Sequence, residues 1–236
     1  MTSLIEGIAG RLGWQIARAT VIVEGTSDVT FLCRASELYA QSHGHPIIDQ
    51  DFAVVAAGQG DEGGVDGVNR MLVTMRQNAL ADRDATGRVR FRFGGLFDKD
   101  YAGKRAFNLA SQFDSSVQRY RDIFLLQPIM PEVGDGISDR MIEATQANIA
   151  YSDLDWEIED LCSESFHQGF ESRHSGLAPG KVQRSDRIHR DFTRQAKSQL
   201  VRDFCDHATL QDALEMVKLI RVLRGYMGVP FDHILV

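Results

Sequence analysis

The chain has 236 residues, of which 43% are hydrophobic and 25% are charged, a composition typical of a globular protein with a sizeable core. The net charge of -7 argues against a surface that is basic overall, so any nucleic-acid site must be local. Cys33, Cys162 and Cys205 are odd in number and widely spaced, which argues against a disulfide framework or a zinc ribbon and fits a reducing, cytoplasmic location. We see no run of eighteen apolar residues and no signal-peptide pattern, so we expect no membrane association.

Short β-branched runs alternate with segments of helical periodicity, which predicts an α/β fold with a Rossmann-like, mostly parallel sheet flanked by helices. Strands are expected at 20–23, 52–57, 89–97 and 123–127. Helices are expected at 28–41, 65–79 and 102–113. Residues 168 to about 183 are rich in Gly, Ser and Pro and show no period, which predicts a long loop. Two amphipathic helices are expected after it, with apolar stripes over 188–204 and 210–223.

These patterns divide the chain into two parts. Residues 1–167 are expected to form the α/β core, and residues 168–236 a loop plus a C-terminal helical extension packed on that core.

Carboxylates stand where two of the predicted strands end. In VIVEGTSDVTFL (21–32), Glu24 follows an apolar run, and in GGLFDKDYAG the residues Asp98 and Asp100 follow another. Ligands of α/β sheets gather at the carboxyl ends of the strands. Alternation along an extended chain places Asp98 and Asp100 on one side, with Lys99 pointing away.

If the strands of Glu24 and Asp98 are neighbours, their carboxylates converge, and mutual repulsion then requires protons or cations. A hard divalent ion such as Mg²⁺ or Mn²⁺ is the natural partner of such oxygen ligands. Each residue alone has a structural alternative: Glu24 in a turn, the Asp pair in a helix cap, and Asp28 as an acid that favours the first helical turn.

A third acidic cluster, SDLDWEIEDLCSE, lies at 152–164. On a helix, Glu157, Asp160 and Glu164 would share one face. A solvated acidic helix start explains this pattern as well as a functional cluster does.

VIVEGTSD followed about seventy residues later by LFDKDYAG resembles the two signature motifs of the Toprim domain, which occurs in topoisomerases, bacterial primases, RNA-maturation nucleases and OLD (overcoming lysogenization defect) nucleases. The similarity covers roughly residues 19–165, and GTSDVTFL is most similar to OLD-like and stand-alone Toprim nucleases. The resemblance implies a Toprim-like core in which Glu24, Asp98 and Asp100 bind metal and perform phosphodiester chemistry. It adds Asp28 as a metal ligand and implies two ions, the second completed by Glu157 or Glu159, of which we prefer Glu159.

The stretch from Arg173 to Arg202 holds eight Lys or Arg residues against two acidic ones, a marked asymmetry in an acidic chain. A positive rim beside a carboxylate site suits a phosphodiester substrate, although a solvated helix face explains it nearly as well. The residues expected to contact nucleic acid are Arg184, Arg187, Arg190 and Arg194. In OLD-like nucleases a lysine after the last acidic motif supports the transition state; Lys197 is its best match here, and Lys181 stays open.

The predicted function is metal-dependent cleavage of nucleic acid, with DNA favoured over RNA. The sequence contains no Walker motif, whereas OLD nucleases carry their own ATPase domain. We therefore expect a separately encoded ATPase partner, as in phage-defence systems, with the leucine-rich final helix as its docking surface; a homo-oligomer is also compatible with the sequence. The alternatives are an RNA-maturation Toprim nuclease and a non-catalytic Toprim-like module that binds nucleic acid or a partner.

Overall fold

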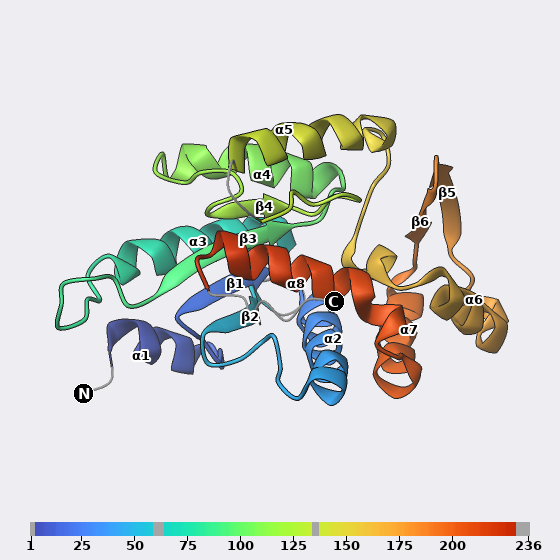
Figure 1. The fold of residues 1–236 in the computed structure, drawn as a ribbon, viewed down its shortest axis with the longest axis horizontal. Helices are drawn as coiled ribbons and strands as arrows, with labels where there is room; N and C mark the ends of the chain where they lie inside the picture. The colour runs from blue at the N-terminus through green and yellow to red at the C-terminus, as the bar shows by residue number, and fades with distance from the viewer. Residues whose placement is uncertain (1–2, 59–63, 134–136, 230–236) are drawn as a thin grey trace.

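The computed structural model describes residues 3–58, 64–133 and 137–229, and these form an α/β fold around a four-stranded parallel sheet (Figure 1). The strands are β1 (Ala19–Val23), β2 (Phe52–Ala56), β3 (Arg92–Phe97) and β4 (Ile123–Leu125). Their order across the sheet is β2-β1-β3-β4, and each neighbouring pair is parallel. The predicted fold class and the four predicted strands are confirmed, although β3 begins at Arg92, three residues later than expected.

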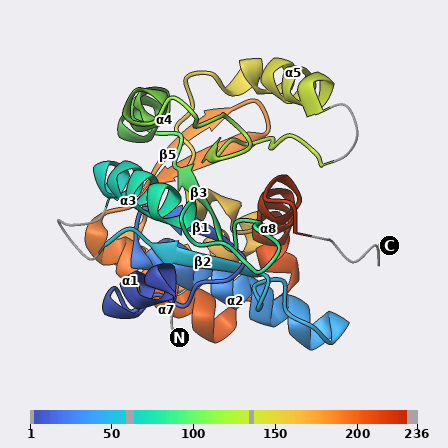
Figure 2. The ribbon, with the colours of Figure 1, turned by 90° about the vertical axis from the view of Figure 1, so that its left-hand side faces the viewer.

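Helices cover both faces of this sheet. They are α1 (Leu4–Arg11), α2 (Thr26–His43), α3 (Gly64–Ala79), α4 (Tyr101–Phe113), α5 (Ile137–Ala147), α6 (Glu164–Arg173), α7 (Arg194–His207) and α8 (Leu214–Tyr226). Figure 2 shows α3 and α4 on one side of the sheet and α2 and α8 on the other. Right-handed crossovers between parallel strands require this placement of α2, α3 and α4, and α8 packs beside α2. Within the described residues, no helix is both long and apolar enough to cross a membrane.

The C-terminal part differs from the sequence prediction. Helix α6 and the 3-10 helix η4 (Ser175–Leu177) occupy most of the predicted loop, and an antiparallel hairpin of β5 (Gly180–Arg184) and β6 (Arg187–Asp191) replaces its end and the start of the predicted helix. All five residues of β5 are exposed, so this strand has no apolar alternation by which the sequence could reveal it. Short 3-10 helices complete the fold, at η2 (Asn148–Tyr151), η3 (Ile158–Leu161), η4 (Ser175–Leu177) and η5 (Gln211–Ala213).

The C-terminal helices pack on the core. The ring of Phe204 in α7 lies edge-on to Phe31 of α2, with centroids 5.0 Å apart, and to Phe166 of α6 at 5.4 Å. The boundary expected at residue 167 falls inside α6, and one cluster of buried apolar side chains runs through both parts. Leu219 and Leu223 of α8 are buried, so the leucines of the final helix do not form the docking surface that the sequence analysis expected.

A hydrogen bond and a close approach of the backbone shape the turn between β3 and α4. The Asp100 carboxylate caps α4 by accepting a hydrogen bond of 2.6 Å from the backbone N–H of Gly103. A Cβ atom at position 103 would lie 2.0 Å from the carbonyl oxygen of Asp98. Glycine at this position therefore lets the helix start directly against the end of β3.

We predict that Gly103→Ala lowers the free energy of unfolding by about 3 kcal/mol, because the added methyl group forces the Asp98 carbonyl away. Gly7→Ala is the matched control, since a Cβ atom there meets nothing within 4 Å and alanine favours the helix by about 0.5–1 kcal/mol. Urea denaturation of both variants measures the two effects. Equal stability of Gly103→Ala and the parent protein would contradict the packing described for this turn.

Candidate functional site

Glu24 and Asp98 meet at the carboxyl edge of the sheet. Glu24 directly follows β1 and Asp98 directly follows β3, and these two strands are parallel neighbours. The backbone N–H of Asp98 donates a hydrogen bond of 3.2 Å to Oε1 of Glu24. The condition set by the sequence analysis, that these two strands lie side by side, is met.

Asp28 lies in the first turn of α2 and is buried. Its Oδ2 accepts a hydrogen bond of 2.9 Å from the backbone N–H of Gly25, and its Oδ1 accepts one of 3.3 Å from the Ser27 hydroxyl. Asp28 therefore stabilises the start of α2 while its charge faces Glu24 and Asp98.

Lys99 points away from the two aspartates that flank it, as alternation predicts. The side chain is buried, and its Nζ donates to the carbonyl oxygens of Tyr151 and, at 2.5 Å, of Leu154. The backbone N–H of Lys99 also donates to the carbonyl of Trp156, at 2.8 Å. Burial, together with Lys104, lowers the pKa of Lys99 to about 8. These contacts fasten the segment before η3 to the end of β3.

The third acidic cluster reaches the site from a short 3-10 turn, η3, and not from the helix that the sequence analysis considered. Glu159 is only 3% exposed. Asp160 accepts hydrogen bonds from the backbone N–H groups of Glu157 and Arg190, each at 2.9 Å, and lies 2.7 Å from Nδ1 of His189. Asp160 thus ties the turn that carries Glu157 and Glu159 to strand β6, a role that the sequence did not reveal.

Lys197 of α7 contacts this turn. Its ammonium group pairs with Glu157 and lies 3.3 Å from Oε1 of Glu159. Burial alone would lower the pKa of Lys197, but the carboxylates of Glu159 and Glu157 outweigh it and raise the pKa, which keeps the lysine charged. The structure therefore brings the predicted lysine to the predicted acidic residues, whereas Lys181 pairs with Glu171 in the hairpin region.

The carboxylates at this edge are held in an environment that disfavours their charge. Burial, with the nearby charges of Asp28, Asp100 and Glu157, raises the pKa of Glu24 to about 8. Burial raises the pKa of Glu159 to about 7 against the opposing effect of Lys197, and that of Asp98 well above its usual range.

Carboxylate oxygens without a hydrogen-bond partner at this edge are suitable ligands for a hard cation. Within the described residues, the Asp98 carboxylate has no hydrogen-bond partner, and Glu24 uses one of its two oxygens for the N–H of Asp98. In the arrangement seen, no three His, Cys, Asp or Glu side chains of the described segments already enclose a metal position. The unpartnered oxygens and the raised pKa values together fit a divalent ion that would stabilise the ionised carboxylates.

The four arginines expected to contact nucleic acid have different surroundings. Arg184 is exposed and pairs with Asp153 at 3.0 Å, and the guanidinium of Arg187 lies 5.9 Å from the centre of the Trp156 ring. Arg190 is 3% exposed and pairs with Glu164, so the structure does not place it on a positive rim as the sequence analysis expected.

Arg194, in contrast, is exposed beside the acidic edge. It lies on one face of α7 with Ser198 and Arg202, and these residues line a groove of about 570 Å³ that also contains Ser27 and Lys197. Among the described residues, neither Arg194 nor Arg202 forms an ion pair. A basic groove thus opens directly beside the carboxylates, and Arg202 is a part of it that the sequence analysis did not single out.

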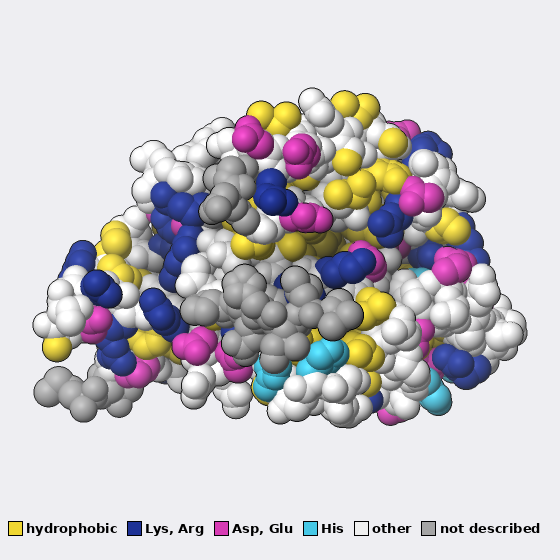
Figure 3. All heavy atoms as spheres, in the orientation of Figure 1, with side chains coloured by type: hydrophobic (Ala, Val, Ile, Leu, Met, Phe, Trp, Pro, Cys, Tyr) yellow, Lys and Arg dark blue, Asp and Glu magenta, His cyan; other side chains and the backbone are white. Residues whose placement is uncertain are grey.

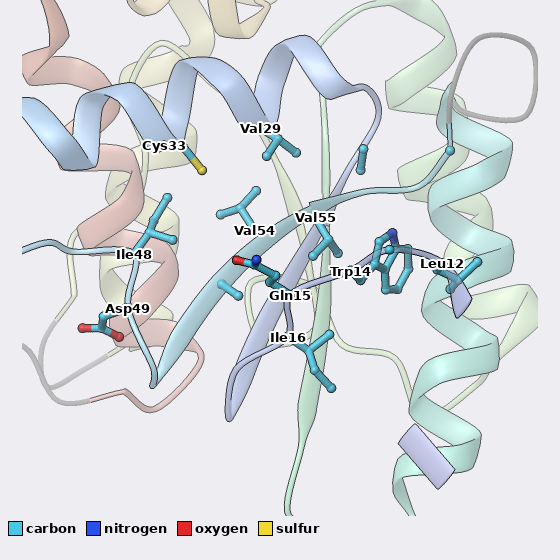
Figure 4. Close-up of a pocket in the computed structure, with 14 residues that line it drawn as sticks. Leu12, Trp14, Gln15, Ile16, Val29, Cys33, Ile48, Asp49, Val54 and Val55 are labelled. Atoms are coloured by element: carbon cyan, nitrogen blue, oxygen red, sulfur yellow. The ribbon is translucent and has the colours of Figure 1, made fainter. Parts of the chain in front are cut away.

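A separate cavity of about 600 Å³ lies along the outer edge of β2 (Figure 4). Side chains such as Trp14, Val29 and Val54 make its lining largely apolar. Asp49 is the one carboxylate among the described residues that line it, and this group pairs with Arg224 at 3.0 Å. The cavity therefore lacks the free acids and bases that the edge of β1 and β3 provides.

We predict that Asp160→Asn lowers the free energy of unfolding by about 1–3 kcal/mol, because one amide oxygen replaces two carboxylate oxygens that serve three donors. Hydrogen exchange should also become faster in β5 and β6. Asp191→Asn, an exposed position on the same hairpin, is the control and should change neither quantity. Unchanged exchange in Asp160→Asn would refute the anchoring role.

Stability without divalent ions should fall as the pH rises from 6.5 to 8. A carboxyl group whose pKa is raised in the folded state, to about 8 for Glu24 and about 7 for Glu159, binds protons that the unfolded chain has already lost. Its favourable contribution is complete below the unfolded pKa of 4.5 and is lost as the pH rises to the folded pKa, with a loss of about 1–2 kcal/mol for each group between pH 6.5 and 8. His167, whose pKa burial lowers to about 3, is neutral in the folded state, whereas the unfolded imidazole is still partly protonated near pH 6.5, so His167 opposes the fall only at the lower end of this window. Burial alone would lower the pKa of His189, but Asp160 outweighs it and raises the pKa, so His189 adds to the fall.

Chemical denaturation in EDTA across this pH range measures the slope. Glu24→Gln and Glu159→Gln should each flatten it, whereas Asp206→Asn, on the exposed face of α7, should leave it unchanged. Stability that rises with pH over this window would contradict the electrostatic account of the site.

Comparison with protein-family models, with curated protein sequences and with solved structures finds no match to the chain. The functional interpretation therefore depends on the sequence motifs and on the geometry of this site.

Proposed function

We propose that this protein is a divalent-metal-dependent nuclease that cleaves phosphodiester bonds, with DNA as the favoured substrate. The observation that carries the proposal is the meeting of Glu24 and Asp98 at the carboxyl edge of the sheet, beside the buried Glu159 and the charged Lys197. Carboxylates of this kind, next to a basic groove, are suited to reaction at a phosphate group.

Glu24 and Asp98 are the residues we assign to hold Mg²⁺ or Mn²⁺, with Asp28, Asp100 and Glu159 as further ligands in a site for two ions. Bound there, the metal would activate a water molecule and stabilise the leaving oxygen. Asp28 and Asp100 also hold the starts of α2 and α4 through hydrogen bonds to Gly25 and Gly103, so their position is fixed by the backbone.

The basic residues bind and orient the substrate in this proposal. Arg194 and Arg202 contact phosphates of the bound strand in the groove along α7, where their guanidinium groups make no ion pair with the described residues. Lys197 lies at the end of this groove nearest the carboxylates and offsets negative charge that develops on the reacting phosphate. Its pairing with Glu157 and Glu159 sets the position of the ammonium group.

The Toprim resemblance supports the same function. We extend the proposal to an OLD-like, stand-alone Toprim nuclease that acts with a separately encoded ATPase in phage defence. The parallel order β1-β3 and the caps formed by Asp28 and Asp100 support this assignment because both motifs then end at one edge. RNA-maturation activity is the alternative within the same chemistry.

One observation favours a non-catalytic binding module instead. Asp28 and Asp100 serve as helix caps, and Lys197 already neutralises part of the charge of Glu157 and Glu159. In such a module the acidic residues would hold the fold together, and the groove along α7 would bind nucleic acid without cutting it.

The test is incubation of the protein with supercoiled plasmid and with structured RNA, in Mg²⁺ and separately in Mn²⁺. We expect the cleavage rate to fall about 100-fold or more in Glu24→Gln and in Asp98→Asn, because each substitution replaces a negatively charged metal ligand by a neutral amide. The control Asp206→Asn should cleave as the parent protein does.

Metal binding provides a second measurement that does not depend on turnover. Mg²⁺ or Mn²⁺ should raise the melting temperature of the parent protein and of Asp206→Asn, but not that of Asp98→Asn. Cleavage that survives in both ligand variants would refute the proposed site. A folded protein with no metal-dependent shift and no cleavage would favour the non-catalytic module.

A further inference from the structure

Three arginines lie at the opposite edge of the same sheet. Arg18 directly precedes β1, Arg92 begins β3, and Arg121 lies two residues before β4. These strands are adjacent and parallel, so their amino ends meet at one edge. The backbone N–H of Arg92 donates to the carbonyl of Arg18 at 2.8 Å, and Nη2 of Arg92 donates to the carbonyl of Arg121 at 2.7 Å. The three residues thus form one connected group at the end far from the carboxylates.

This group borders a cleft of about 500 Å³. Its charged lining consists of Arg18, Arg76, Arg90, Arg92 and Arg121, with Asp114 and Asp122. Figure 3 shows Lys and Arg side chains gathered on the left of the visible face, at the end of the molecule where α3 and β3 lie in Figure 1. Positive charge therefore exceeds negative charge in this cleft, although the protein as a whole is acidic.

The buried Asp122 fixes the positions of the arginines. This residue is 2% exposed, and its carboxylate lies 2.7 Å from Nη1 of Arg76, 2.6 Å from Nη2 of Arg121 and 3.9 Å from Nη2 of Arg92. Arg76 also donates to the Ser116 hydroxyl at 3.2 Å. One carboxylate thus orients three guanidinium groups before any ligand arrives, which reduces the entropy lost on binding.

Several donors of the cleft remain without partners. Within the described residues, the Arg18 side chain makes no hydrogen bond or ion pair, and Arg121 has no partner for Nη1. Arg92 uses only Nη2. Burial and the neighbouring charges of Arg121 and Arg76 lower the pKa of Arg92, against the opposite effect of Asp122. An anion in the cleft would supply acceptors for these donors and reduce the repulsion among the cations.

We propose that this cleft is a second ligand site, which binds a phosphate-bearing molecule of about the size of a nucleotide through Arg18, Arg92 and Arg121. Guanidinium groups match phosphate oxygens in pairs, and the volume lies within the range of small-molecule sites. The apolar side chains of Leu80, Val89 and Phe91 also line the cleft and provide a surface for a base or a sugar. The proposal does not depend on the nuclease assignment.

The test is isothermal titration calorimetry of the full chain in EDTA with pyrophosphate, with ATP and with a short oligonucleotide that carries a 5′-phosphate. We expect saturable binding of pyrophosphate or ATP with one site per chain, or oligonucleotide binding of which one component depends on Arg18, because the groove along α7 also offers a site to the oligonucleotide. Arg18→Gln and Arg92→Gln should each weaken it at least tenfold, since each removes unpaired donors. Because the Arg18 side chain is exposed and makes no hydrogen bond or ion pair with the described residues, Arg18→Gln should fold normally.

Two controls separate this site from the carboxylate edge. Arg11→Gln, an exposed position on α1, removes the same charge outside the cleft and should bind as the parent protein does. Glu24→Gln should also bind normally. ATP binding at least tenfold tighter than that of pyrophosphate would identify a free nucleotide, and preference for the oligonucleotide would identify a strand end. No binding of any probe, or binding of pyrophosphate, ATP and the oligonucleotide that is the same in Arg18→Gln, in Arg92→Gln and in the parent protein, would overturn the proposal.

Discussion

Charge crowding at the carboxyl ends of β1 and β3 is the constraint on which the rest of the structure depends. Two adjacent parallel strands each end in a carboxylate, and the turn of η3 adds Glu159 from a third direction. Such an arrangement is costly unless protons or cations balance it. Lys197 provides one positive charge beside Glu157 and Glu159, while burial and the neighbouring carboxylates raise the pKa of Glu24 to about 8.

Much of the surrounding structure serves to hold these groups in place. The buried Lys99, which stands between Asp98 and Asp100 in the sequence, joins the end of β3 to the segment before η3. Its ammonium group donates to the carbonyl oxygens of Tyr151 and Leu154. Asp160 joins η3 itself to β6, and α7 then brings Lys197 to the same turn. The C-terminal hairpin and helices therefore support the candidate site, and one cluster of buried apolar side chains runs through both parts of the chain.

The sequence predicted the strands and the positions of the side chains that follow them correctly where an apolar strand pattern ends directly in a chemically distinctive side chain. An apolar run that ends in an acidic residue predicted both β1 and β3 and the meeting of Glu24 with Asp98, since parallel strands end at the same edge. It failed where side chains are fixed by distant partners. In the sequence, Asp160 and Arg190 have the pattern of surface charges, yet both are buried. Asp160 contacts His189, and Arg190 pairs with Glu164, so each partner lies far away along the chain. Strand β5 was missed because an exposed strand has no apolar alternation.

The central claim is that the edge formed by Glu24 and Asp98 holds divalent metal, and the most direct test is crystallographic. Crystals grown with Mn²⁺ should show an anomalous difference peak about 2.0–2.4 Å from carboxylate oxygens of Glu24 and Asp98. The same experiment on Asp98→Asn should show the peak lost or strongly reduced. An anomalous map without a peak at this edge, from crystals in which Mn²⁺ is bound elsewhere on the chain, would contradict the account.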